Sequence, residues 1–225
     1  MNLILFDLDH TLLNGDTQSE WGCYLADRGV IDLAAYQEAM AVFDETYHRG
    51  ALDIRALVEF QIKILKPYSL PTLHAWSEEF VQERIRPLLV EAGWKAIAEH
   101  KKQGDELVLI TATNEFLTTP IAKLLGIQHL IASQEEYDAQ GNLTGFFCGI
   151  PSYREGKVTR FHQWLKEQGR KRSDYNKILF YSDSHNDLPL LSLVDEPIIV
   201  NPDSHLREHA FKNKWKIVDF GIQRR

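Results

Sequence analysis

The sequence predicts an α/β protein, a doubly wound parallel sheet interrupted near its start by an inserted helical segment. One observation is a short, wholly apolar strand over residues 2–6 that runs straight into the polar residues 7–16. Parallel sheets bury their strands on both faces and carry functional loops at the strand ends. The other is the order of elements, because helical patterns follow one another over residues 17–86, whereas strands and helices alternate from residue 87 onwards.

Residues 17–86 carry apolar side chains at the three- and four-residue spacing of amphipathic helices. Asp16 and Thr17 are candidate N-caps for the first helix and Asp32 for the second, since their side chains accept hydrogen bonds from free amides. No strand pattern separates these helices, which predicts a helical cap domain. The expected helices begin near Thr17, follow Asp32, and span 53–65 and 71–85.

After Pro87 the pattern becomes that of a parallel sheet. Alternation around Gly141-Asn142 predicts a β-hairpin beside the sheet over residues 134–148. The domain organisation predicted from these patterns is a core of residues 1–16 and 87–225 with a cap of residues 17–86. The expected core elements are helices over 88–103, up to about 125, over 155–168 and 188–193, a last helix beyond residue 200, and strands over 106–110, 128–132, 177–181, 197–200 and 215–218.

The composition limits the function classes. The chain has 225 residues, of which 44% are hydrophobic and 25% charged, as in an ordinary globular protein. The net charge of −7 and the lack of a long Lys/Arg tract argue against nucleic acid as a partner. The first residues lack the basic region of a secretion signal. No uninterrupted apolar run reaches the roughly 18 residues that a membrane-spanning helix needs. We therefore expect a cytoplasmic protein without a membrane partner. Cys23 and Cys148 lack CxxC spacing and are expected to be buried free thiols. The sequence does not indicate an oligomeric state.

Two carboxylates, Asp7 and Asp9, follow the first predicted strand. Alternation along an extended chain sends both to the same side, where they repel each other unless a cation lies between them. A hard divalent ion such as Mg2+ suits oxygen ligands and also binds phosphate oxygens. The alternative is that this Asp-Leu-Asp run only caps a loop.

A second acidic pair, Asp183 and Asp187, follows the strand predicted over 177–181. Asp183 is the candidate metal ligand and Asp187 the candidate supporting residue. His185 and Asn186 between them could instead form a transition-metal site. The sequence offers no further His or Cys at ligand spacing, which favours oxygen-coordinated Mg2+.

Thr111 and Lys157 are candidate phosphate-binding residues. Thr111 follows the apolar strand over 106–110, and Lys157 begins a helix after a loop. A hydroxyl and an ammonium group at the same sheet edge would hold phosphate and offset the carboxylates. Taken singly, Thr111 could satisfy backbone groups and Lys157 could be an ordinary surface lysine.

In this order, these motifs resemble those of the haloacid dehalogenase superfamily. The superfamily's DxDxT motif matches Asp7-Asp9-Thr11, and Thr111, Lys157 and Asp183-Asp187 follow as its later motifs. The inserted helical segment and the run from Ser182 to Pro189 are similar to the phosphoserine phosphatase branch. The run around Thr111-Ala112-Thr113 looks like relatives labelled histidinol-phosphatase-like. Ser182 and Ser184 stand where the branch often has glycine.

The resemblance implies a HAD-like Rossmannoid fold and a phosphatase mechanism. It implies that Asp7 is the nucleophile and Asp9 the general acid and base. It further implies that Asp7, Asp9 and Asp183 hold Mg2+, with Asp9 contributing its backbone carbonyl. The residues that it implies for substrate binding are Thr11, Asp16, Thr111, Ala112, Lys157 and Asn186, with Asp187 supporting the site.

Asp16 has two interpretations. In the phosphoserine phosphatase pattern, a carboxylate at this spacing meets the ammonium group of the substrate. The other interpretation, equally supported, is that Asp16 only caps the helix that begins at Thr17. The predicted substrate is a small phosphate monoester, which would be amino-bearing if Asp16 reads an amine, as in phosphoserine or histidinol phosphate. The alternatives are phosphoryl transfer to a small alcohol and a catalytically silent module that binds a phosphorylated metabolite.

Overall fold

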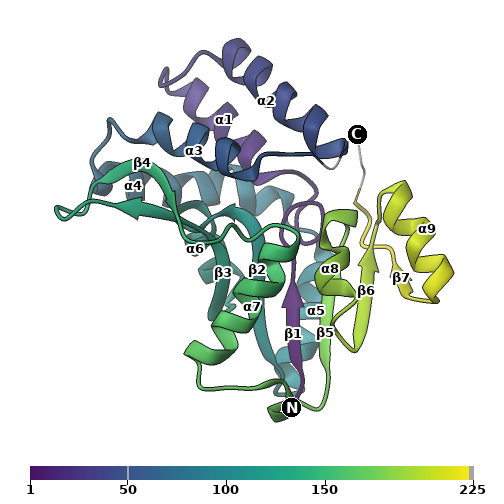
Figure 1. The fold of residues 1–225 in the computed structure, drawn as a ribbon. Coiled ribbons are helices and arrows are strands. Elements are labelled where there is room, and N and C mark those ends of the chain that lie inside the picture. The colour runs from purple at the N-terminus through teal and green to yellow at the C-terminus, as the bar shows by residue number, and fades with distance from the viewer. Residues whose placement is uncertain (50, 223–225) are drawn as a thin grey trace.

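The computed structural model, which describes residues 1–49 and 51–222, has a mostly parallel sheet flanked by helices (Figure 1). The strands are β1 (Leu3–Phe6), β2 (Glu106–Asn114), β3 (His129–Tyr137), β4 (Leu143–Cys148), β5 (Ile178–Ser182), β6 (Glu196–Val200) and β7 (Lys216–Val218). Their order in the sheet is β4-β3-β2-β1-β5-β6-β7, and neighbours run parallel except for the antiparallel pair β3 and β4. The first strand therefore lies in the middle of the sheet, and its carboxyl end opens at the point where the strand order reverses, where such sheets bind ligands.

Helices cover both faces of the sheet. They are α5 (Glu91–Lys102), α6 (Glu115–Leu125), α7 (Glu155–Glu167), α8 (Leu188–Leu191) and α9 (Ser204–Asn213). Leu3 and Leu5 of β1 belong to the hydrophobic cluster with α7, α8 and α9, whereas Ile4 and Phe6 belong to the cluster with α5 and α6. Each of these four side chains is fully buried. This burial on both faces explains why β1 is a continuous apolar run instead of an alternating one.

The inserted segment is helical, as predicted. It contains α1 (Thr17–Asp27), α2 (Leu33–His48), α3 (Ile54–Leu65) and α4 (Leu70–Phe80). Asp16, Asp32 and Asp53 cap the first three, each accepting a hydrogen bond from the amide three residues ahead. Helices α1, α2 and α3 lie beyond the carboxyl end of β1 (Figure 1). No helix within residues 1–49 or 51–222 has the length and apolar character needed to cross a membrane.

Several boundaries differ from the predicted ones. The helix expected over 71–85 is regular only to Phe80, and a π-type turn over Val81–Ile85 then leads to the 3-10 turn Arg86–Leu88. Pro87 lacks an amide hydrogen, so a regular helix cannot continue through it. The next helix begins at Glu91 instead of residue 88.

The β-hairpin predicted over residues 134–148 is present, with Gln134 paired to Cys148, but its placement and the prediction about the cysteines need correction. Strand β3 continues to Tyr137, so the hairpin with β4 extends the sheet edge and is not a separate unit beside it. Cys148, at the end of β4, is exposed, and Cys23 is partly exposed, so the prediction of two buried thiols was wrong. Side chains alternate across a strand, and position 148 faces solvent.

Candidate active site

The centre of the candidate site is the buried ammonium group of Lys157. Its Nζ atom lies 2.8 Å from Asp7 Oδ1 and 2.8 Å from both carboxylate oxygens of Asp187. All three residues are at most 7% exposed. Burial raises the pKa of Asp7 to about 6, although Lys157 opposes that shift. Burial lowers the pKa of Lys157, but the charges of Asp187 and Asp7 outweigh it and keep the pKa above its ordinary value. Lys157 is therefore a permanent cation beside Asp7 and not a surface lysine.

Local backbone geometry brings Lys157 into the site. Helix α7 follows Arg154, whose φ of 51° turns the chain sharply. A Cβ atom at Gly156 would lie 2.0 Å from the carbonyl oxygen of Pro151. Any other residue at position 156 would push the first turn of α7 away from this loop. The glycine thus allows the lysine side chain to enter the site.

Thr11 joins the first and last motifs. Its Oγ1 atom lies 3.0 Å from Asp183 Oδ1 and 3.4 Å from Asp7 Oδ2, and the residue is fully buried. The bend that allows this follows Asp9, where His10 adopts a left-handed φ of 54°. The structure thereby brings Asp7, Thr11 and Asp183 together as the sequence predicted.

Two threonines hold the Asp9 carboxylate. Oδ1 accepts hydrogen bonds from the Thr17 amide at 2.7 Å and from its hydroxyl at 2.5 Å, and Oδ2 accepts one from the Thr113 hydroxyl at 2.8 Å. Burial raises the pKa of Asp9 to about 7, and the negative charge of Asp16 adds to the rise. Asp9 is therefore oriented at both oxygens, and its carboxyl group titrates near neutral pH.

Thr113 is a site residue that the sequence interpretation missed, because the strand was expected to end at Ile110. Strand β2 instead runs to Asn114, with a register irregularity between Ile110 and Asn114. The apolar-to-polar change at Thr111 marks the approach to the site and not the end of the strand. The missing signal was the repeat of threonine at a two-residue interval, which places both side chains on one face of a strand.

Thr111 and Ala112 lie within β2 and not after it. Thr111 is 1% exposed, and its Oγ1 atom accepts a hydrogen bond from the Thr113 amide at 3.2 Å. The carbonyl of Ala112 accepts one from the Ser133 hydroxyl at 2.9 Å. Both residues directly precede Thr113, whose hydroxyl bonds Asp9, and their role in binding phosphate remains a prediction.

The loop that carries the second acidic pair is closely braced. The Ser182 hydroxyl donates to Asp187 Oδ2 at 2.7 Å and so helps to hold Asp187. Asn186 is 2% exposed, and its Oδ1 atom accepts a hydrogen bond from the Tyr153 hydroxyl at 2.9 Å. Tyr153 is a second residue near the site that the sequence did not single out.

Asp16 caps helix α1. Its Oδ1 atom accepts hydrogen bonds from the amide and hydroxyl of Ser19 at 2.8 and 2.9 Å. In the described part of the chain, no hydrogen bond is made to Oδ2. The capping role is thus present, and a second role in reading a substrate amine remains a prediction.

The donor set suits a hard cation. Asp7 and Asp187 hold the Lys157 ammonium group, Asp183 is joined to Asp7 through Thr11, and burial raises the pKa of Asp7 and of Asp9. Within residues 1–49 and 51–222, however, no three acidic, His or Cys side chains form a metal-binding group. The ligands that the resemblance implies are two carboxylates, from Asp7 and Asp183, and the Asp9 carbonyl, and of these the structure brings the two carboxylates together at Thr11. Mg2+ keeps several of its waters and needs few protein ligands, so it fits this set.

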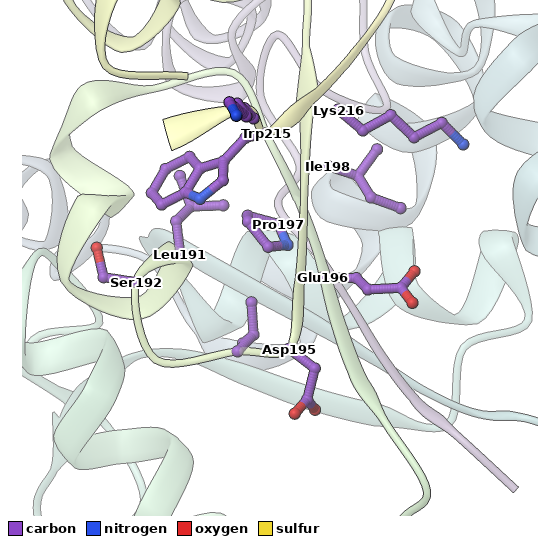
Figure 2. A pocket seen from close by; sticks show the side chains of 10 residues that line it. Leu191, Ser192, Asp195, Glu196, Pro197, Ile198, Trp215 and Lys216 are labelled. Atoms are coloured by element: carbon purple, nitrogen blue, oxygen red, sulfur yellow. The ribbon is translucent and has the colours of Figure 1, made fainter. Parts of the chain in front are cut away.

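A hollow of about 360 Å³ lies elsewhere on the core (Figure 2). Trp215, Glu196 and Lys216 are among its lining residues. These residues belong to the amino-terminal ends of β6 and β7 or lie beside them, whereas Asp7 follows the carboxyl end of β1. The hollow is thus separate from the candidate active site.

Comparisons with known proteins agree with the geometry. The family model for haloacid dehalogenase-like hydrolases matches residues 4–192. A histidinol-phosphatase of Neisseria meningitidis is 42% identical over 219 residues, which cover 97% of this chain and 99% of that protein. Phosphoserine phosphatase SerB1 of Mycobacterium tuberculosis is 30% identical over 223 residues, which cover 98% of this chain and 71% of that protein.

Solved structures share the fold. A protein of unknown function from Bordetella pertussis superimposes with a TM-score of 0.91 at 43% identity, covering 97% of this chain and 98% of that one. A phosphoserine phosphatase solved as a phospho-aspartyl intermediate analogue has a TM-score of 0.66 at 22% identity, covering 99% and 94% of the two chains. The second likeness concerns the fold alone. The chain belongs to the haloacid dehalogenase-like hydrolases and is a phosphatase of that family.

Proposed function

We propose that the chain is a Mg2+-dependent phosphatase that hydrolyses a small, amino-bearing phosphate monoester through a phospho-aspartate on Asp7. The observation that carries this proposal is the buried arrangement of Lys157 between Asp7 and Asp187, with Thr11 joining Asp7 to Asp183. It supports the proposal because the Asp7 carboxylate, the proposed nucleophile, lies beside a fixed cation and close to a second carboxylate, that of Asp183. The names of the relatives, a histidinol-phosphatase and a phosphoserine phosphatase, support an amino-bearing ester.

In the first half of the reaction, a carboxylate oxygen of Asp7 attacks phosphorus and the bond from phosphorus to the ester oxygen breaks. Asp9 gives its proton to the departing alkoxide. In the second half, Asp9 takes a proton from water, and that water releases phosphate from the aspartyl phosphate. Lys157 offsets the charge on the phosphoryl oxygens, and bound Mg2+ would supply further charge neutralisation.

The hydrogen bonds of Asp9 favour a proton on Oδ2 over one on Oδ1. The Thr17 amide that bonds Oδ1 can only donate, whereas the Thr113 hydroxyl at Oδ2 can turn and accept. A proton on Oδ2 therefore keeps every hydrogen bond of the carboxyl group. Thr113 would hold the general acid in both of its protonation states.

Phosphate release from a panel of esters tests the function directly. The panel contains p-nitrophenyl phosphate, phosphoserine, histidinol phosphate and glycerol phosphate, each with Mg2+ present. We expect turnover of the aryl ester and higher kcat/KM for an amino-bearing ester. Adding a large excess of glycerol separates hydrolysis from transfer, because a transferase would form glycerol phosphate at the expense of free phosphate. No release from any ester would overturn the proposal.

Replacing Thr113 by Val is expected to lower kcat/KM for alkyl phosphates about tenfold to hundredfold, the value of one hydrogen bond to a charged group. The loss for p-nitrophenyl phosphate should be below about threefold, because that leaving group departs without needing a proton. Thr118→Val is the matched control, since the Thr118 hydroxyl is buried but donates to the backbone carbonyl of Asn114. Equal losses on both ester types would show that Thr113 is only structural.

Replacing Asp16 by Asn is expected to weaken hydrolysis of amino-bearing phosphates by roughly 1.5 to 3 kcal/mol in kcat/KM, the scale of a charge-assisted hydrogen bond. Activity on p-nitrophenyl phosphate should change little, because Asn caps a helix about as well as Asp. The measurement is the ratio of the two kcat/KM values in the parent and the variant. An unchanged ratio would leave Asp16 with its capping role alone.

A further inference from the structure

Helix α2 of the inserted segment reaches the loop that carries the second acidic pair. The Tyr47 hydroxyl lies 2.7 Å from Ser184 Oγ, and this hydrogen bond joins residues 137 positions apart in the chain. Ser184 directly follows Asp183, the candidate metal ligand. The bond therefore links the last turn of a cap helix to the centre of the site.

Core residues also hold this loop, among them Tyr153 and Asp203. The Tyr153 hydroxyl donates to Asn186 Oδ1 at 2.9 Å, and Asp203, which caps α9, accepts a hydrogen bond from the His185 amide at 2.9 Å. The ring of Tyr47 lies 6.3 Å from the rings of both Tyr153 and His185. Tyr47 thus adds a contact that comes from the inserted segment.

Ser184 transmits the brace to the catalytic centre. Its Oγ atom accepts a hydrogen bond from the Asn186 amide at 3.2 Å and so caps the short 3-10 turn His185–Asp187. Asp187, at the end of this turn, holds Lys157 beside Asp7. If Ser184 moved, the turn would lose its cap, and Asp187 would hold Lys157 less firmly beside Asp7. A glycine at position 184 would have no hydroxyl to make either bond.

We propose that Tyr47 is a positioning residue that, through Ser184, couples docking of the inserted helices to ordering of the 183–187 loop. When the helices dock, the phenol orders the loop, and when they lift, the loop loses one of its braces. The inference rests on the proposed function, because it assigns Tyr47 a part in the same reaction. Burial, followed by the charge of Asp183, raises the pKa of Tyr47, so the phenol stays protonated at neutral pH.

The first test is Tyr47→Phe, which keeps the ring and removes the hydroxyl. We expect kcat for p-nitrophenyl phosphate to fall about fivefold to twentyfold, the size of one lost hydrogen bond, with KM within about twofold of the parent. Ser184→Ala should also lose activity, and the double variant should be within about twofold of Ser184→Ala alone, because the hydrogen bond between Tyr47 and Ser184 is already lost in Ser184→Ala.

Tyr24→Phe is the matched control. Like Tyr47, Tyr24 bonds a polar side chain through its hydroxyl, but its partner is Glu79 of the inserted segment. The ring of Tyr24 packs against Trp21 and Phe80 and not against the 183–187 loop. Its kcat should stay within twofold of the parent. Activity of Tyr47→Phe within twofold of the parent, or a double variant whose loss is the product of the two single losses, would overturn the coupling.

A second measurement does not depend on catalysis. Hydrogen–deuterium exchange followed by mass spectrometry should show faster exchange in Tyr47→Phe over residues 33–49 and 183–187 together, and no change there in Tyr24→Phe. Faster exchange in α2 alone would mean that Tyr47 only anchors its own helix, and the proposal would fail. If the parent releases phosphate from no ester, the proposed function fails, but the exchange pattern still decides whether Tyr47 couples the two segments.

Discussion

Replacing Asp7 by Asn is expected to lower kcat/KM by about 10³-fold or more, which corresponds to about 4 kcal/mol of barrier. The amide has almost the same shape as the carboxylate, and its oxygen can still accept the hydrogen bond that Lys157 Nζ donates to Asp7 Oδ1 at 2.8 Å. The fold should therefore persist. The loss arises because an amide oxygen cannot act as the nucleophile that forms an acyl phosphate.

Steady-state phosphate release measures this loss, and a rapid acid quench identifies the intermediate. The parent enzyme should retain phosphate that hydroxylamine removes, as an acyl phosphate does, and Asp7→Asn should retain none. Asp32→Asn is a suitable control, since Asp32 caps α2 and Asn is an equally good cap. A variant at Asp7 with more than a tenth of the parent activity would rule out the proposed nucleophile.

Removing divalent cations is expected to abolish turnover, and adding Mg2+ should restore it. Asp7 and Asp183 accept hydrogen bonds from the same Thr11 hydroxyl, so their two carboxylates are close together and need a cation to offset their repulsion. Ca2+ should support the reaction poorly, because its larger and more flexible ligand shell misplaces the nucleophile.

A thermal melt provides a readout of Mg2+ binding that is independent of activity. A saturating ion that binds only the folded state, at about 100 times its Kd, stabilises it by about 2.7 kcal/mol, so Mg2+ should raise the Tm. Asp183→Asn should reduce that rise, whereas Asp138→Asn, in the exposed turn of the hairpin, should not. Full activity in exhaustively chelated enzyme would exclude the metal dependence.

The sequence predicted the sheet and most helices because their signals are local. The apolar run of β1 and the N-caps Asp16 and Asp32 each depend on a few neighbouring residues, and the structure confirms them. The ends of β2 and β3 depend on pairing instead. Asn114 still pairs with Ser133 although its side chain is polar, and no pattern within one segment reports such a partner.

The same distinction applies to the site. The DxDxT run and the acidic pair at Asp183 and Asp187 were recognisable because spacing within a motif is fixed. The contacts that orient the motifs were not, since they join separate elements: Thr113 to Asp9, Tyr153 to Asn186, and Tyr47 to Ser184. A threonine or tyrosine is common in any sequence, and its role follows only from what the fold places beside it.

The separation in sequence of the paired site residues has a consequence for biosynthesis. Lys157 meets Asp7 across 150 positions and Thr11 meets Asp183 across 172, while β1 pairs with strands that begin 100 or more residues later. Such non-local parallel pairing forms late and slowly. A chain emerging from the ribosome thus carries Asp7, the proposed nucleophile, from the start, but the contacts of Asp7 with Lys157 and of Lys157 with Asp187 cannot form until residue 187 has been synthesised. Enzymatic activity in this protein therefore requires that β1 has paired with both β2 and β5.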